Sequence, residues 1–169
     1  MDEAERLIAA FRARETSSVR SKLDTLLDLE RLREPRVVPF LLDVLADRRE
    51  PAPVRIRVLK RLRSGHLVPG HRPAVAEAIL RVVSDRCGSD LRLPAVLALA
   101  EFTDVEGVPT TLGTLALDPN EPIDFRYSAF TSLQRAGPTA ECVALLRQLS
   151  TDEALGRSAR RVLSLWHFA

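Results

Sequence analysis

The sequence contains little that would support a metal site, a disulfide framework or a membrane segment. Its 169 residues include two cysteines and three histidines, and aromatic residues make up 5%. Cys87 and Cys142 form no CxxC pair, so both thiols are expected to be reduced and buried. No apolar run approaches the roughly 20 residues that span a bilayer, and the charged N-terminal segment is unlike a signal peptide. We therefore expect a cytoplasmic protein that makes no membrane contact.

An excess of charge of one sign is also missing. The chain has 25 Lys+Arg and 23 Asp+Glu, which gives a formal net charge of +2. Such a balance does not point to nucleic acid or to a membrane surface. Hydrophobic residues make up 46% of the chain, so we expect a single folded domain, residues 1–169, with a core built mainly from Leu, Val and Ala.

Catalytic motifs are absent as well. His66, His71 and His167 form neither HExxH nor another two-histidine helical pair, and there is no GxSxG, GxGxxG or P-loop motif. A serine or cysteine nucleophile would need a histidine base, and the spacing suggests none. We therefore predict no catalytic residues, no metal and no cofactor, and we predict that the chain is not an enzyme.

What the sequence does contain is an internal repeat with a period of about 34 residues. Val38, Leu42 and Leu45 are spaced by four and then three positions, which keeps one face of a helix apolar. The same spacing begins again at Val75, Val108 and Cys142, and more weakly at Ala4. Pro39 and Pro109 lie where a proline suits the first turn of a helix. Each repeat is therefore expected to open with a helix.

A second helix with a ladder of its own follows each first helix. Arg20, Arg55, Arg92 and Arg126 recur with the same period, and Ala159 takes this place in the last unit. Apolar residues three and seven positions later are predicted to face the core: Leu23, Leu27, Val58, Leu62, Ala95, Leu99, Ala129, Leu133, Val162 and Trp166. No alternation of period two indicates a strand. The predicted fold is all-α, with five helix pairs at about 2–34, 35–68, 72–103, 105–137 and 138–169.

The segment PRVVPFLLDVLAD at 35–47, followed by Val54-Arg55, resembles a HEAT-like (armadillo-type) helical repeat, and the unit that begins at Val108 is similar. In that family an aspartate follows the first helix and a Val-Arg pair opens the second. The aspartate position is held here by Asp47, Asp85, Asp118 and Asp152. The resemblance implies a right-handed α-solenoid of antiparallel helix pairs, although the period is shorter than the roughly 40–47 residues of HEAT units.

The repeated charged residues are interpreted as structural. We expect each aspartate to cap a turn and each ladder arginine to pair across adjacent units. The first unit lacks the aspartate and the last lacks the arginine, as capping units often do. These residues are therefore left out of the candidate binding site.

A solenoid often binds its partners on the surface of its second helices. Positions one and five after each ladder arginine should point away from the core, and several of them are apolar: Ile56, Leu93, Leu97 and Tyr127. This apolar row is either a binding groove or packing between units. A basic block, Arg48–Arg72, has eight Lys and Arg side chains against Glu50 alone, and the stretch 101–124 has six acidic side chains and no basic one.

The separation of charge along the chain suits oriented recognition of a protein. We therefore predict a non-catalytic scaffold or adaptor that binds another protein or peptide through the apolar row together with Arg57, Lys60 and Arg61. The alternative is a nucleic-acid-binding helical repeat that uses the basic block, although no aromatic residue is interleaved there for stacking. A third candidate is a lyase-like subunit of an enzyme complex.

The C-terminal helix is rich in apolar residues. Trp166 and Phe168 are expected to fold over the last core. Any apolar patch that remains there should support weak self-association.

Overall fold

The computed structural model describes residues 1–13, 18–63 and 69–168. These residues form ten α-helices and three short 3-10 helices, and no strand occurs among them. The predicted all-α class is therefore confirmed. Within the same ranges no helix combines the length and the apolar character that a bilayer crossing requires. The chain divides into two compact units, Met1–Pro94 and Ala95–Ala169.

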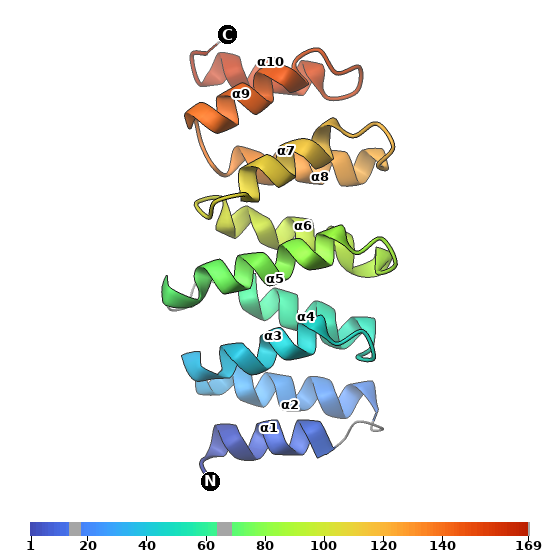
Figure 1. Cartoon of the computed structure of the whole chain (residues 1–169), viewed down its shortest axis with the longest axis vertical. Helices are drawn as coiled ribbons and strands as arrows, with labels where there is room; N and C mark the ends of the chain where they lie inside the picture. The colour runs from blue at the N-terminus through green and yellow to red at the C-terminus, as the bar shows by residue number, and fades with distance from the viewer. Residues whose placement is uncertain (14–17, 64–68, 169) are drawn as a thin grey trace. The chain divides into compact units, whose positions relative to one another are not determined.

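The first unit contains α1 (Glu3–Ala13), α2 (Val19–Leu32), α3 (Val38–Ala46), α4 (Ala52–Arg63), α5 (Arg72–Ser84) and the start of α6 (Ser89–Leu99). The short helices η1 (Pro35–Val37) and η2 (Pro69–His71) lead into α3 and α5. Helix α2 packs on α1 and α4, while α3 packs on α4 and α5. The helices α1, α3 and α5 thus lie in one layer and α2 and α4 in the other (Figure 1).

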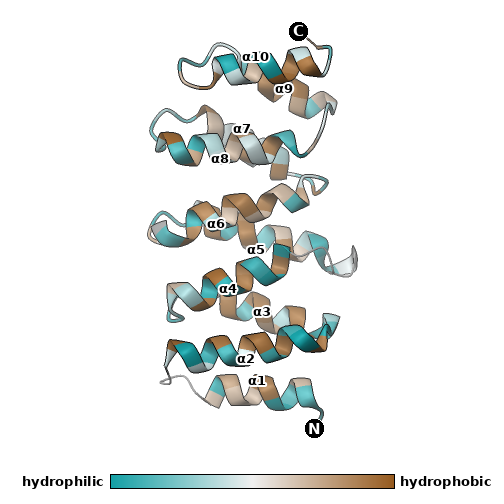
Figure 2. Cartoon of the chain, turned by 180° about the vertical axis from the view of Figure 1, so that it is seen from behind, coloured by the Kyte–Doolittle hydropathy of each residue, from teal (hydrophilic) through white to brown (hydrophobic). Residues whose placement is uncertain are grey.

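The second unit contains the end of α6, η3 (Ala100–Phe102), α7 (Val108–Leu117), α8 (Ile123–Gln134), α9 (Ala140–Leu149) and α10 (Gly156–Leu165). Helix α7 packs on α8 and α9, and α9 packs on α10. Gly113 permits the close approach of α7 and α9, because a Cβ atom there would lie 2.6 Å from a methyl carbon of Leu145. Figure 2 shows hydrophobic and hydrophilic residues alternating along the even-numbered helices, as expected for helices with one buried face.

The four repeated aspartates close the turns between helices. Each carboxylate accepts a hydrogen bond from the backbone N–H two positions later, at 2.9 Å for Asp47, 3.1 Å for Asp85, 2.9 Å for Asp118 and 2.9 Å for Asp152. A side chain that bonds its own backbone in this way stabilises a tight turn. The capping role predicted for these aspartates is therefore confirmed.

The ladder arginines satisfy the end of the preceding helix. The Nε–H groups of Arg55, Arg92 and Arg126 donate to the carbonyls of Leu45, Val83 and Ala116 at 2.8, 2.8 and 2.9 Å. Each acceptor is the next-to-last residue of its helix, where a carbonyl has no partner within the helix. In the last helix pair, Ala159 holds the position of the ladder arginine. The next residue, Arg160, takes that role and donates from Nη1 to the carbonyl of Ser150.

Pairing across adjacent units, which we predicted for the ladder arginines, is seen at Arg126. Its Nη2 lies 2.6 Å from Oδ1 of Asp152, the turn aspartate of the next unit, and both side chains are largely buried. The turn aspartate Asp85 pairs instead with Arg48, at 3.2 Å.

The register predicted for the first helix pair of the repeat is wrong. Arg20 is exposed, and the buried cation of α2 is Lys22, whose Nζ lies 2.8 and 3.0 Å from the two carboxylate oxygens of Glu50. The residues three, four and seven positions after Lys22 are buried: Thr25, Leu26 and Leu29. Leu23 is consequently only half-buried and Leu27 is exposed. In the second, third and fourth helix pairs the predicted core positions, from Val58 to Leu133, are all buried. In the fifth pair, Val162 and Trp166 are only half-buried, and Leu163 is buried instead.

The end of the chain matches its prediction only in part. Trp166 is half-buried, whereas Phe168 stays exposed although its backbone N–H bonds the carbonyl of Leu163 at 2.8 Å. Leu165 is 68% exposed on the last turn of α10. An apolar patch therefore remains at this end of the second unit.

Candidate partner-binding surface

Every even-numbered helix presents the same three positions away from its core. Counted from the inward residue of each helix (Lys22, Arg55, Arg92, Arg126 or Ala159), they lie two before, one after and five after it. We call them the outward positions: Arg20, Leu23 and Leu27; Pro53, Ile56 and Lys60; Asp90, Leu93 and Leu97; Asp124, Tyr127 and Thr131; Arg157, Arg160 and Ser164. All fifteen are exposed or half-buried.

The predicted apolar row lies at the protein surface. Leu93 and Leu97 are 41% and 39% exposed, and Tyr127 is 52% exposed. Ile56 is half-buried on α4. Packing between units, the other interpretation of this row, therefore does not describe Leu93, Leu97 or Tyr127. The ring of Tyr127 rests against the buried ring of Phe130, with centroids 6.1 Å apart.

The structure brings some of these residues together. Leu93 and Leu97 lie one turn apart on α6. In the second unit the end of α6 contacts α8, because the hydroxyl of Ser132 donates to the carbonyl of Val96 at 3.1 Å. Leu97 and Tyr127 therefore lie on helices in direct contact. Ile56 and Leu93 belong to the first compact unit, whereas Leu97 and Tyr127 belong to the second.

Three apolar residues at the surface were not predicted from the sequence. Ile123, 52% exposed, lies one turn before Tyr127 on α8. Leu23 and Leu27 occupy outward positions on α2 and were assigned to the core because the ladder was started at Arg20. A ladder that starts at Lys22 also fits the repeat and would have placed Leu23 and Leu27 at outward positions.

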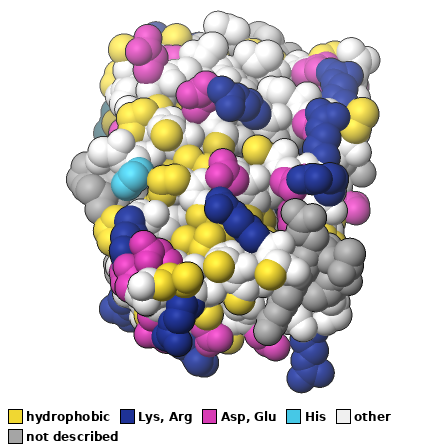
Figure 3. Space-filling view, turned by 60° about the horizontal axis from the view of Figure 1, so that its bottom comes forward, with side chains coloured by type: hydrophobic (Ala, Val, Ile, Leu, Met, Phe, Trp, Pro, Cys, Tyr) yellow, Lys and Arg dark blue, Asp and Glu magenta, His cyan; other side chains and the backbone are white. Residues whose placement is uncertain are grey.

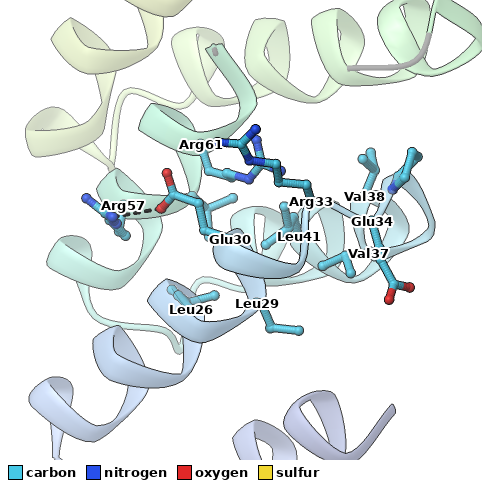
Figure 4. A pocket seen from close by; sticks show the side chains of 12 residues that line it. Leu26, Leu29, Glu30, Arg33, Glu34, Val37, Val38, Leu41, Arg57 and Arg61 are labelled. Carbon is cyan, nitrogen blue, oxygen red and sulfur yellow. Dashed lines mark hydrogen bonds and ion pairs between the residues drawn. The ribbon is translucent and has the colours of Figure 1, made fainter. Parts of the chain in front are cut away.

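The three predicted basic residues of α4 do not form one group. Nη2 of Arg57 pairs with Oε2 of Glu30 at 2.7 Å, and both residues line a crevice with Arg61. Figure 4 shows the guanidinium groups of Arg33 and Arg61 on the same side of this crevice as Glu30. Its volume is about 20 Å³, which is room for little more than a water molecule. Lys60 does not line it and is exposed at an outward position.

The basic block of the sequence is divided in space. Arg48 and Arg49 precede α4 and pair with Asp85 and Asp47 at 3.2 and 3.1 Å. Lys60 and Arg63 lie at the other end of α4, which at 1.5 Å per residue is about 18 Å long. Arg55 is buried between them, and this burial lowers its pKa. On the face seen in Figure 3, side chains of both charges are interleaved.

A groove that sequence reasoning did not anticipate lies between α3 and α5. It has a volume of about 390 Å³ and an apolar lining that includes Leu42, Ala78 and Val82. Its charged residues largely neutralise one another, since Arg81 pairs with Glu77 at 2.6 Å and Arg48 pairs with Asp85. The groove therefore favours no ligand of a particular charge.

The described residues offer little reactive chemistry. No group of three or more His, Cys, Asp or Glu side chains among them is placed to hold a metal ion. His66 lies outside the described residues. Cys142 is buried, and its desolvation raises the thiol pKa to about 11. Cys87 is exposed, so the prediction that both thiols are buried is wrong for Cys87.

Comparisons with protein-family models, with curated proteins and with solved structures found no match to this chain. Its function must therefore be inferred from the outward positions and from their chemistry.

Proposed function

We propose that this chain is a HEAT-like helical-repeat module that binds a protein or peptide partner and catalyses no reaction. In this proposal the five helix pairs form a right-handed α-solenoid. The repeated contacts support it, because aspartate turns and arginine-to-carbonyl bonds recur with the same geometry in successive helix pairs. Neighbouring repeats that bury one another's apolar faces are typical of such proteins.

One observation carries the proposed binding role. Leu93, Leu97 and Tyr127 are exposed at the outward positions of α6 and α8. The core does not require apolar residues at these positions, because their side chains are not part of it. Exposed apolar and aromatic side chains on rigid helices are suited to anchor a partner, because such anchors dominate the energy of protein interfaces.

The α4 residues have a different part in the proposal. Ile56 is half-buried and extends the apolar contact, while Arg57, Lys60 and Arg61 supply positive charge. Charges at the rim of an interface mainly accelerate association and contribute less to the final affinity. Lys60 is the best placed of the three, since Arg57 is already paired with Glu30.

Affinity capture with matched variants tests the proposal. The wild-type chain, Leu93→Asp/Leu97→Asp and Leu165→Asp are immobilised in equal amounts and exposed to an extract of the native host. Leu165→Asp is the control, because it also replaces an exposed leucine by a carboxylate but lies outside the outward positions. We expect a protein that is retained by the wild type and the control and lost with the double variant. Identical retention by all three folded proteins would contradict the proposal.

A gel shift separates this function from nucleic-acid binding. The division and pairing of the basic block favour the protein partner, because a phosphate backbone requires several unpaired cations along one path. We expect no shift with duplex or single-stranded DNA or RNA at micromolar protein. A shift that weakens steeply with salt, and that is lost in Lys60→Ala but kept in Leu93→Asp, would replace the proposal with the alternative.

A further inference from the structure

Helices α8 and α10 present two faces of complementary charge in the same layer of the second unit. They run in the same direction, since the chain reverses at each end of α9 (Figure 1). They are successive second helices of the repeat, so Asp124 and Arg157 occupy equivalent outward positions. Ser128 and Arg161, one turn further along, are equivalent in the same way.

The outward face of α8 is apolar and acidic. Its sequence, IDFRYSAFTSLQ, contains one basic residue, Arg126, which is buried and bonded to Ala116 and Asp152. Ile123 and Tyr127 are each 52% exposed, and Asp124 lies beside them. The carboxylate of Asp124 forms no ion pair with any residue that the structure describes.

The outward face of α10 is basic. Its sequence, GRSARRVLSL, contains three arginines and no acidic residue. Arg160 bonds the carbonyl of Ser150, whereas Arg157 and Arg161 are exposed and have no hydrogen bond or ion pair within the described part of the chain. These two guanidinium groups lie one turn apart on the same face of the helix.

From this arrangement we propose that a second copy of the chain binds the α8–α10 face through a two-fold axis. An axis parallel to the two helices and midway between them places α8 of one copy against α10 of the other, in the same direction and at the same height. Because Asp124 and Arg157 are equivalent in the repeat, this rotation sets each Asp124 opposite Arg157 of the other copy. A symmetric dimer therefore contains the pair twice.

The same rotation covers the exposed apolar residues of α8. The aliphatic stems of Arg157 and Arg161 can lie along Ile123 and Tyr127, and a guanidinium over the Tyr127 ring adds a cation–π contact. Two helices per copy form a small interface, so the dimer is weak and depends on protein concentration. It needs no other partner and stands independently of the proposed function, although it covers Tyr127 and would compete with a partner for that residue.

Sedimentation velocity of the full chain, over micromolar to millimolar concentrations, tests the proposal. We expect the wild type to shift from monomer toward dimer, with weaker association at high salt. Asp124→Arg and Arg157→Asp should each lower the association constant at least tenfold, because each introduces two like-charge contacts per dimer. The swap Asp124→Arg/Arg157→Asp should restore association to within a few-fold of the wild type, since it exchanges the charges and keeps the pairs.

Asp24→Arg is the matched control. Asp24 is an exposed aspartate on α2 without a partner among the described residues, so its reversal should leave the association constant unchanged. Circular dichroism establishes that each variant is folded. Should Asp124→Arg unfold, Ser128→Arg offers a second perturbation of the same interface, because it sets a cation opposite Arg161 of the other copy. A wild type that stays monomeric, or a dimer that Asp124→Arg and Arg157→Asp leave intact, would overturn the proposal.

Discussion

The contacts of Arg126 lead to a quantitative prediction for stability. Its guanidinium donates from Nε to the carbonyl of Ala116 at 2.9 Å and from Nη2 to Asp152 at 2.6 Å. In Arg126→Met the apolar stem is retained while both bonds are lost. Asp152 keeps its bonds from the backbone N–H groups of Ala154 and Leu155, so its carboxylate is only partly stranded.

The expected loss follows from these contacts. Hydrogen bonds to charged groups contribute about 1.5–3 kcal/mol each, and removal of one member of a buried ion pair destabilises by about 3–5 kcal/mol. We expect Arg126→Met to lower the free energy of unfolding by about 3–4 kcal/mol. This is the lower part of the range for a broken ion pair, because Asp152 keeps its two bonds from backbone N–H groups. Arg92→Met removes the bond to the carbonyl of Val83 and should lower it by about 1–3 kcal/mol.

Urea unfolding provides the measurement. Trp166 is the only tryptophan and lies in the second unit, so its fluorescence reports on the part of the chain that contains Arg126. A double-mutant cycle of Arg126→Met with Asp152→Asn should give a coupling energy of about 1–3 kcal/mol. A loss below about 1 kcal/mol for Arg126→Met, or no coupling to Asp152, would refute the structural role assigned to this arginine.

Three further predictions concern other parts of the chain. Lys22→Met should lower stability by about 3–5 kcal/mol because it leaves the largely buried carboxylate of Glu50 without its cation, and Lys22→Met/Glu50→Gln should recover part of that loss in the same urea assay. Hydrogen bonds from the side chain and backbone of Arg49 lower the pKa of Asp47. Burial raises the pKa of Asp152, but hydrogen bonds from Leu155, Arg126 and Ala154 outweigh this effect, so the pKa of Asp152 is also lowered. Both carboxylates therefore stabilise the fold above their unfolded pKa of about 3.9, and this contribution should disappear as the pH falls through the lower folded values, with a smaller loss in Asp152→Asn. A thiol reagent near pH 8 should modify Cys87 in the folded chain and both cysteines in urea, because Cys142 is buried with a pKa of about 11; modification of both thiols in the native protein would contradict this.

The helices and most of the core could be predicted because the repeat shows the same pattern several times. Core positions such as Val58, Leu99 and Leu133 were identified from the spacing after each arginine, and all are buried. The register of the first helix pair was predicted incorrectly because Arg20 and Lys22 lie two positions apart, and either could continue a ladder of this period. Only the contact with Glu50, in the turn that follows α3, selects Lys22 as the buried cation.

The candidate surface was harder to predict than the core. Helical spacing identified Leu93, Leu97 and Tyr127 as outward residues, but it left their burial between units open. The basic block looked continuous in the sequence because residues on opposite faces and ends of α4 are neighbours there. Its division depends on pairs such as Arg48 with Asp85 and Arg57 with Glu30, which join side chains from different helix pairs.

The repeat separates the two kinds of position by their physical roles. An inward cation must reach a carbonyl at the end of the preceding helix, so Arg55, Arg92 and Arg126 are alike. The outward positions share one geometry and, apart from Arg160, meet no such demand. Their chemistry therefore differs from helix to helix, with aspartate on α8 and arginine on α10 at the same site. Different chemistry on equivalent positions gives a repeat protein faces that can recognise a partner. It also makes two of its own faces complementary under a simple rotation.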